Sequence, residues 1–360
     1  MSKISKAEEE RALSIRREAI TIDGDCAIHG KISPFNAGFF KGVQGVINVA
    51  VVTTNSCTAY FGPDNFREGV RRISAIYNAV NNHPETLKLV STVDDIYKAK
   101  KEGKVGIVPY FQGSGAVTSG AIKVHDTSLV EVLYRLGLRM MIPTYNWRTP
   151  LGDGCIERKP SGLSKYGIKV IEEMNRVGMI VDVSHCSDPG VQDCLEVSKD
   201  PIVMSHAHSR SLTDNPRNKT DEHLKAVAEK GGVVGAAAFS PILMNQRKKT
   251  DRPTIDDFFR HMEYLINLIG IDHVAIGSDV GEGDVDVPHD MMELHARVLS
   301  PEVYLECQKE TWFAKDLDRH SIIMPNITKG LVARGYSDQD IKKVLGENWI
   351  RIYKRIWKPI

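Results

Sequence analysis

The stretch "GLSKYGIKVIEEMNRVGMIVDVSH", residues 162–185, contains one complete helix-to-strand step. Its first part repeats apolar residues at helical spacing and ends at Gly178, which favours a helix over 162–178. Its second part, 179–185, is a short apolar run that ends in a Ser-His pair. A strand that is buried on both faces has this composition. The stretch therefore predicts a helix that packs on a strand of a parallel sheet.

The same alternation of apolar runs and amphipathic stretches extends along most of the chain. Strands are predicted at 19–23, 46–53, 105–111, 138–145, 179–185, 201–207, 232–239 and 273–279. Helices are predicted at 64–82, 127–137, 162–178, 220–231 and 255–270. Alternating units of this kind form a parallel sheet that helices cover. Eight strands, with no glycine-rich dinucleotide-binding turn after the first, favour a closed (β/α)8 TIM barrel over an open doubly wound sheet.

The chain continues beyond the last predicted strand through two further helical patterns, 300–317 and 337–357. We expect residues 301–360 to form C-terminal helices packed on the barrel, so that 1–360 is a single domain. The polar stretch 281–300 is long for a loop and is interpreted as a lid or cover over the barrel.

The composition indicates a small-molecule partner. The chain of 360 residues has 47 Lys plus Arg against 46 Asp plus Glu, so nothing in its charge favours nucleic acid or an anionic membrane. Its charged first 19 residues lack the apolar core of a signal peptide, and no apolar run has the length of a bilayer span. The six cysteines form no CxxC pair. These features predict a cytoplasmic protein with reduced, mostly buried thiols.

Polar side chains stand where several of the predicted strands end. They are Asp25, Gln112, Tyr145, Asn146, His185, His206 and Asp279. In a TIM barrel these strand ends form the active site. Two histidines on successive strands can hold one divalent ion, and Asp279 can either ligate this ion or take a proton from a water that the ion activates. Alternatively, His185 and His206 are ordinary core histidines, each hydrogen-bonded with the help of the serine before it.

The loop after the sixth predicted strand carries a second group of candidates. The Arg217 guanidinium can hold a substrate carboxylate through two parallel hydrogen bonds, with Asn218 beside it. A surface salt bridge is the alternative for Arg217. His208, two residues beyond His206, either reaches the site or lines a loop.

Long stretches of the sequence resemble the membrane (renal) dipeptidases of the amidohydrolase superfamily. They are "GLSKYGIKVIEEMNRVGMIVDVSH" at 162–185, "PIVMSHAHSRSLTDNPRNKTDE" at 201–222, "GIDHVAIGSD" at 270–279 and "GYSDQDIKKVLGENWIRIYKRIW" at 335–357. The resemblance implies an amidohydrolase-type barrel that binds two zinc ions, hydrolyses dipeptides and forms a homodimer. It places His185, His206 and Asp279 at metal-ligand positions. It places Arg217 and Asn218 beside the substrate's carboxylate.

The sequence departs from the family at four positions that carry its chemistry. Asp25 and Ala27 replace the histidine and aspartate of the first-strand pair, and Gln112 replaces the glutamate that bridges both metals. Tyr145 replaces a histidine associated with the scissile carbonyl. Alanine offers no ligand atom, and a neutral amide lacks the charge that lets a carboxylate bridge two dications. We therefore predict one tightly bound divalent ion, zinc, with ligands drawn from His185, His206, Gln112, Asp25 and Asp279.

Three functions are consistent with this pattern. The first is a metal-dependent hydrolase of a small dipeptide-like or amide substrate, with Asp279 as the base, Tyr145 as a donor to the developing oxyanion and Arg217 as the carboxylate anchor. The second is another reaction on the same scaffold, a lyase, decarboxylase or deaminase, in which Asp25 and Tyr145 handle protons. The third is a barrel that binds a ligand without catalysis.

Overall fold

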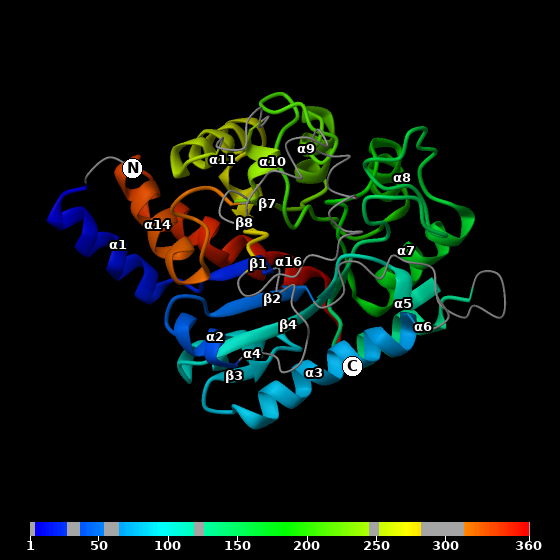
Figure 1. The fold of residues 1–360 in the computed structure, drawn as a ribbon, viewed down its shortest axis with the longest axis horizontal. Helices are drawn as coiled ribbons and strands as arrows, with labels where there is room; N and C mark the ends of the chain where they lie inside the picture. The colour runs from blue at the N-terminus through cyan, green and yellow to red at the C-terminus, as the bar shows by residue number, and fades with distance from the viewer. Residues whose placement is uncertain are drawn as a thin grey trace.

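The computed structural model describes residues 4–26, 37–53, 65–118, 126–244, 252–281 and 313–359, with backbone alone for 37–39. Its strands form two parallel sheets. They are β1 (Ile22–Cys26), β2 (Val49–Thr53), β3 (Leu87–Leu89), β4 (Val105–Phe111), β5 (Met140–Met141), β6 (Ile180–Val181), β7 (Val234–Ala236) and β8 (Val274–Ile276). The first sheet runs in the order β1-β2-β4-β5-β6, and β7 pairs with β8 in the second. Figure 1 shows β1, β2 and β4 side by side at the centre of the molecule.

Single parallel bridges join the two sheets into a ring. Asp182 bridges to Val203, and Met204 bridges to Val234, so that the segment 203–204 fills the place between β6 and β7. A further bridge from Cys26 to Val280 closes the ring between β1 and β8. The ring therefore has eight positions, and the predicted TIM barrel is confirmed.

The strands differ from the sequence prediction in several details, and β5 to β8 are shorter than predicted. The first strand is β1, at Ile22–Cys26, and not 19–23, so Asp25 lies within the strand and not beyond it. The sixth predicted strand, 201–207, is reduced to two bridges, from Val203 to Asp182 on one side and from Met204 to Val234 on the other. The short strand β3 was not predicted; it pairs beside the first half of β4.

Gly24 lets a tryptophan of the C-terminal helices pack directly on β1, between its two aspartates. A Cβ atom at Gly24 would lie 2.3 Å from Cζ2 of Trp349, so only glycine lets the indole pack on the strand. Trp349 is fully buried, and its Nε1 donates to the carbonyl of Ile276 at 2.9 Å. The C-terminal helix that carries it thus covers β1 and β8 together.

Helices surround the ring. Those before β8 are α1 (Lys6–Glu18), α2 (Ala37–Val43), α3 (Asn65–Asn82), α4 (Val93–Lys101), α5 (Gly115–Thr118), α6 (Ser128–Arg135), α7 (Lys165–Val177), α8 (Asp188–Val197), α9 (Asp221–Glu229), α10 (Ser240–Leu243), α11 (Ile255–Ile269) and the 3-10 turn η1 (Ile271–His273). The five predicted helices correspond to α3, α6, α7, α9 and α11. Their end signals act as predicted: Thr220 caps α9 by accepting from His223 N, and Gly178 ends α7 in the left-handed conformation.

The chain after β8 ends in helices that contact the barrel strands. They are α14 (His320–Ala333), α15 (Asp338–Lys342), the π-turn η3 (Lys343–Glu347) and α16 (Asn348–Ile356). In Figure 1, α14 lies beside α1 at one end of the molecule, and the two helices are in contact. The helix predicted over 300–317 is wrong for 313–317, because Phe313 pairs with Phe239 and Ala314 N donates to the carbonyl of Ala238. Its remaining part and the predicted lid at 282–300 lie outside the described residues.

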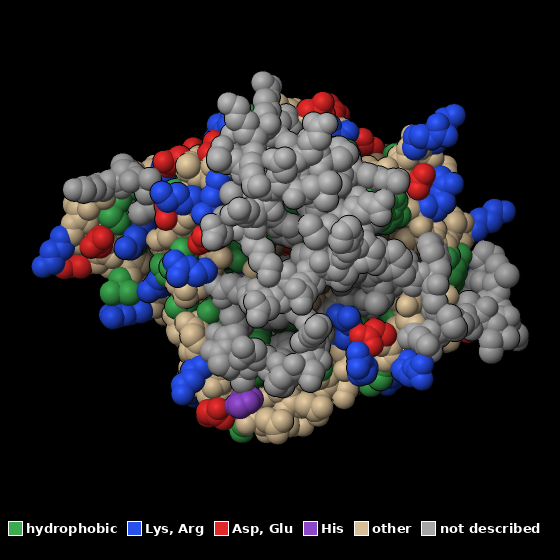
Figure 2. Space-filling model, in the orientation of Figure 1, with side chains coloured by type: hydrophobic (Ala, Val, Ile, Leu, Met, Phe, Trp, Pro, Cys, Tyr) green, Lys and Arg blue, Asp and Glu red, His purple; other side chains and the backbone are tan. Residues whose placement is uncertain are grey.

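Charges of both signs mix on the described surface. In Figure 2, basic and acidic side chains alternate around the face shown. Glu131, for example, pairs with both Arg135 and Arg176. Within the described ranges, no helix combines the length and apolar composition that a membrane crossing requires.

Candidate active site

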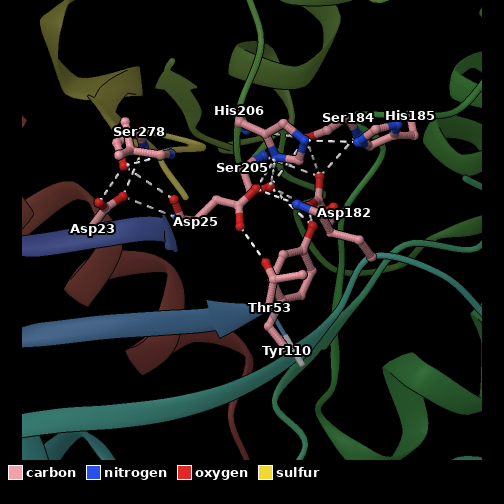
Figure 3. Close-up of polar contacts among 12 residues, drawn as sticks. Asp23, Asp25, Thr53, Tyr110, Asp182, Ser184, His185, Ser205, His206 and Ser278 are labelled. Atoms are coloured by element: carbon pink, nitrogen blue, oxygen red, sulfur yellow. Dashed lines mark hydrogen bonds and ion pairs between the residues drawn. The ribbon is translucent and has the colours of Figure 1, made fainter. Parts of the chain in front are cut away.

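The polar residues that follow or end the strands meet at one mouth of the ring. Figure 3 shows them from β1 and β2, from β4, from the ends of β6 and 203–204, and from the end of β8. Asp25, Gln112, Tyr145, His185 and His206 are all at most 5% exposed. The structure therefore brings together residues that lie far apart in the sequence.

The two predicted histidines face each other across the mouth. Nε2 of His185 lies 2.9 Å from Nε2 of His206. Nδ1 of His185 lies 2.7 Å from Oδ1 of Asn146, and Nδ1 of His206 lies 2.7 Å from Oδ2 of Asp25. The ring of Tyr145 stacks on His185, with centroids 4.1 Å apart. Each imidazole is thus held on one side by an oxygen, while the other nitrogens converge.

This arrangement fixes the chemistry of the converging nitrogens. Oxygen acceptors beside both Nδ1 atoms favour tautomers that carry the hydrogen there, which leaves a lone pair on each Nε2. Two nitrogen ligands of one zinc ion, each about 2.1 Å from it, lie about 2.9–3.4 Å apart. The observed separation of 2.9 Å falls at the near end of that interval. The histidine pair therefore fits one divalent ion.

Asp25 is already satisfied by protein donors. Its Oδ1 accepts from the hydroxyl of Thr53, and its Oδ2 accepts from Nε2 of Gln112 at 2.5 Å and lies beside Nδ1 of His206. The amide at position 112 thus supplies a hydrogen to a carboxylate, where a glutamate would repel it. The carboxylate of Asp25 and the side-chain amide of Gln112 therefore form a hydrogen-bonded pair.

Asp279 approaches the same group from the end of β8. Its N–H donates to the carbonyl of Asp25 at 2.9 Å, and its backbone is in the left-handed region with φ at 56°. Ligand atoms of Asp25, His206 and Asp279 lie within 4.8 Å of one another. Burial raises the pKa of Asp279 to about 7; His206 opposes this shift and Asp25 adds to it. A carboxyl group with this pKa can exchange a proton near neutral pH.

Arg217 reaches the mouth from the loop above 203–204. Its Nη1 donates to the carbonyl of Ser184, next to His185. Its Nη2 is buried and has no hydrogen-bond partner within the described ranges. Asn218 is turned the other way: its Nδ2 donates at 2.9 Å to the carbonyls of both Thr213 and Ile242. Arg217 therefore offers a free donor beside the histidines, while Asn218 secures the loop that carries it.

The remaining sequence candidates lie away from the mouth or outside the described part. His208 packs in the barrel wall, where Nε2 lies 2.8 Å from the carbonyl of Ala237 and the ring meets His261 of α11. Burial lowers the pKa of His208 well below its usual range. Cys26 and Cys186 are buried, as predicted. The described ranges do not include Ala27, His29, His289 or His295.

Two buried aspartates beneath the mouth were missed by the sequence prediction. Asp182 in β6's extension and Asp23 in β1 are both fully buried and accept hydrogen bonds from serines at the strand ends. The signal that could have found them is a charged residue inside an apolar run, as in "MIVDVSH" and "TID". A buried carboxylate requires such donors.

A closed barrel of parallel strands, with imidazoles and carboxylates gathered at one mouth, defines the class of the amidohydrolase-type enzymes. The sequence model described as "Membrane dipeptidase (Peptidase family M19)" matches residues 10–300. The chain therefore belongs to this family of dipeptidase-like hydrolases.

Relatives of known structure agree with this assignment. An amidohydrolase from Pseudomonas aeruginosa is 29% identical and superimposes with a TM-score of 0.80 over 96% of this chain and 99% of its own. A metallopeptidase from Rhodobacter sphaeroides, crystallised with a phosphinate mimic of the dipeptide L-Ala-D-Ala, has a TM-score of 0.73 over 94% and 100% of the two chains. At 18% identity, this second likeness shows the fold alone.

A curated relative is also named for dipeptidase activity. The dipeptidase verJ of Clonostachys rogersoniana is 26% identical over 80% of this chain. The match spans 65% of that fungal protein's own length. Activity and substrate therefore pass from it to this chain only as proposals.

Proposed function

We propose that the protein is a metal-dependent hydrolase of a small dipeptide-like or amide substrate with a free carboxylate, and that it uses one divalent ion, zinc. The observation that carries the proposal is the convergence of the two Nε2 atoms at 2.9 Å, with an oxygen beside each Nδ1. His185 and His206 would hold the ion, and Asp25, Asp279 or Gln112 would complete its ligands.

The charges around the mouth support one ion and not two. A second dication needs a bridging carboxylate, and this chain has a glutamine that donates its amide hydrogen to Asp25. Asp25 and Asp279 remain as acidic side chains near His206. Two carboxylates with two neutral imidazoles match the charge of one divalent ion.

The side chains divide the remaining work. When bound, the ion would act as a Lewis acid and lower the pKa of a water molecule. Asp279 would accept the proton of the attacking water and return it to the leaving amine. Arg217 would bind the substrate's carboxylate through Nη2, and Tyr145 would donate a hydrogen bond to the oxygen that becomes negative. The barrel walls exclude bulk water from these groups.

Purified protein can test this proposal with a panel of dipeptides and acylated amino acids, assayed with zinc, manganese or cobalt. We expect hydrolysis that a chelator removes and that His206→Ala abolishes. Substrates whose carboxylate is amidated should react poorly, because Arg217 then lacks its partner. If the ion binds to the histidines and every compound of the panel stays intact, hydrolysis is wrong, and the site performs another reaction class. A cytoplasmic location and a homodimer remain predictions from the sequence and the family.

A further inference from the structure

Each of the three predicted functional residues at the β6, 203–204 and β8 strand ends directly follows a serine. The pairs are Ser184 with His185, Ser205 with His206, and Ser278 with Asp279. All three serines are at most 1% exposed. Because a serine offers both a backbone N–H and a side-chain O–H, one acceptor can bind it through two bonds.

Asp182 binds two of these serines at once. Its Oδ1 accepts from Ser184 N at 2.9 Å, Ser184 Oγ at 2.6 Å and Ser205 N at 3.1 Å. Its Oδ2 accepts from Ser205 Oγ at 2.5 Å and from the hydroxyl of Tyr110. Five donors on one buried carboxylate leave it little freedom to move. Figure 3 shows Asp182 below and between the two histidine-bearing ends.

Asp23 binds the third serine in the same way. Its Oδ1 accepts from Ser278 N at 2.8 Å, and its Oδ2 accepts from Ser278 Oγ at 2.6 Å. This pair crosses the β1–β8 junction, which the bridge from Cys26 to Val280 also closes. Both buried aspartates therefore use one device: a carboxylate that accepts the N–H and the O–H of the serine before a functional residue.

The device explains how the functional side chains keep their direction. A serine bound through both its backbone and its side chain fixes the position and the orientation of the next Cα atom. Asp279 needs this support most, because its left-handed φ of 56° costs energy in any residue other than glycine. Ser205 adds a direct contact, since its Oγ lies 2.7 Å from Nδ1 of His206.

We propose that Asp182 and Asp23 are positioning residues, which hold His185, His206 and Asp279 in their reactive arrangement through the three preceding serines. The proposal rests on the proposed function, because the ion and the reaction are what these residues would serve. Both aspartates bind the serines that precede these residues, so each acts through its serine.

Removing a single serine hydroxyl tests this positioning role with little risk to the fold. Ser184→Ala and Ser278→Ala each delete one side-chain bond to a buried carboxylate, and we expect Co²⁺ and Zn²⁺ affinity to fall about 10–100-fold, the usual effect of losing a group that orients a ligand. Ser198→Ala is the matched control: Ser198 is buried at the end of α8, and its Oγ donates to the carbonyl of Asp200 at 2.9 Å. The control should lose similar thermal stability and keep its ion affinity.

A second readout does not depend on a bound ion. In ion-free protein, ¹⁵N spectra of the imidazoles should show changed tautomer populations at both His185 and His206 in Asp182→Asn. Unchanged rings in Asp182→Asn, together with unchanged ion affinity in both serine variants, would overturn the proposal. If the wild type binds no ion, only the proposed function is contradicted. The ring spectra would still test whether Asp182 positions the two histidines.

Discussion

The two halves of the mouth differ in how they satisfy their polar groups. In the histidine half, at the ends of β6 and 203–204, the Nε2 atoms of His185 and His206 lie 2.9 Å apart. In the aspartate half, at β1 and β4, Asp25 is bound by Thr53 and Gln112, and it also contacts His206. The first half brings two nitrogens together that fit a cation. In the second half, hydrogen-bond donors of the protein surround the carboxylate.

This difference explains why Asp25 and Gln112 occur together in this chain. The resemblance to the family implies a histidine and a glutamate where this chain has Asp25 and Gln112. Exchanging only the glutamate would leave a neutral amide without a charged partner, and exchanging only the histidine would place two carboxylates together. The joint change keeps one carboxylate with one amide, which is a stable pair without a second ion.

Removing His206 should have the largest effect, because this residue links both halves. We expect His206→Ala to weaken ion binding by at least about 100-fold, more than the loss of an orienting group, and to lower any hydrolysis in proportion. Isothermal titration with Zn²⁺ and the dipeptide assay measure both. His273→Ala is a suitable control, since His273 only contacts the carbonyl of Gly232 at the opposite end of β8. Equal losses in the two variants would contradict the assignment.

Arg217 tests whether the histidine half also binds substrate. Arg217→Lys keeps the charge and loses the planar pair of donors, so KM should rise about 10–100-fold with kcat nearly unchanged. Steady-state kinetics separate these two parameters. Arg210→Lys controls for the loop, because Arg210 pairs with Asp188 at 2.7 Å near the same segment. A fall in kcat without a change in KM would show that Arg217 does not anchor the carboxylate.

Thr53 tests the aspartate half. Thr53→Val removes a hydrogen bond to a buried carboxylate, which should lower the free energy of unfolding by about 1.5–3 kcal/mol. Thr21→Val removes a comparable buried bond to a neutral acceptor, the carbonyl of Val46 at 3.0 Å, and should cost about 1 kcal/mol. Chemical denaturation measures both variants. If Thr21→Val costs more, the Thr53 contact with Asp25 is not charge-assisted.

The stability of the ion-free protein should depend on pH through Asp279. Its pKa is raised from 3.8 to about 7, so the folded state binds more protons than the unfolded state between these values. Stability should therefore fall as pH rises from about 4 to about 7, by about 1 kcal/mol after allowing for the partial exposure of Asp279 and for solvent screening. His206, whose pKa Asp25 and Asp279 raise against the effect of burial, acts in the same direction. Thermal unfolding in chelator should show this slope, and Asp279→Asn should reduce it.

Much of the fold was predictable because the barrel repeats one strong signal. Apolar runs and amphipathic helices with clear ends, such as α7 and α9, were found at their true places. Strand β3 was missed because three residues carry too little pattern, and β1 was misplaced because the polar residues from Asp23 to Asp25 were taken to end the strand. The burial of Asp23 and Asp25 depends on hydrogen-bond donors at the ends of β2, β4 and β8. These strands are distant in the sequence, so no local pattern shows the donors.

The candidate site was predictable as a set of residues and not as a network. The strand-end rule selected His185, His206 and Asp279, and the structure brings His206 together with each of the other two. The bond from Gln112 to Asp25 and the serine clamps of Asp182 could not be read from spacing, because they join strands far apart in the sequence. The orientation of Asn218 could not be predicted either, because its side chain donates to the carbonyl of Ile242 in α10, which is also distant in the sequence.

The number of metal ions per chain tests the central claim most directly. Protein purified without chelators, then saturated with Zn²⁺ and freed of excess ion, should contain one equivalent by elemental analysis. The same preparation of His206→Ala should contain almost none. Two tightly bound equivalents in the wild type would contradict the account, because they would show that Asp25 and Gln112 still hold a second cation.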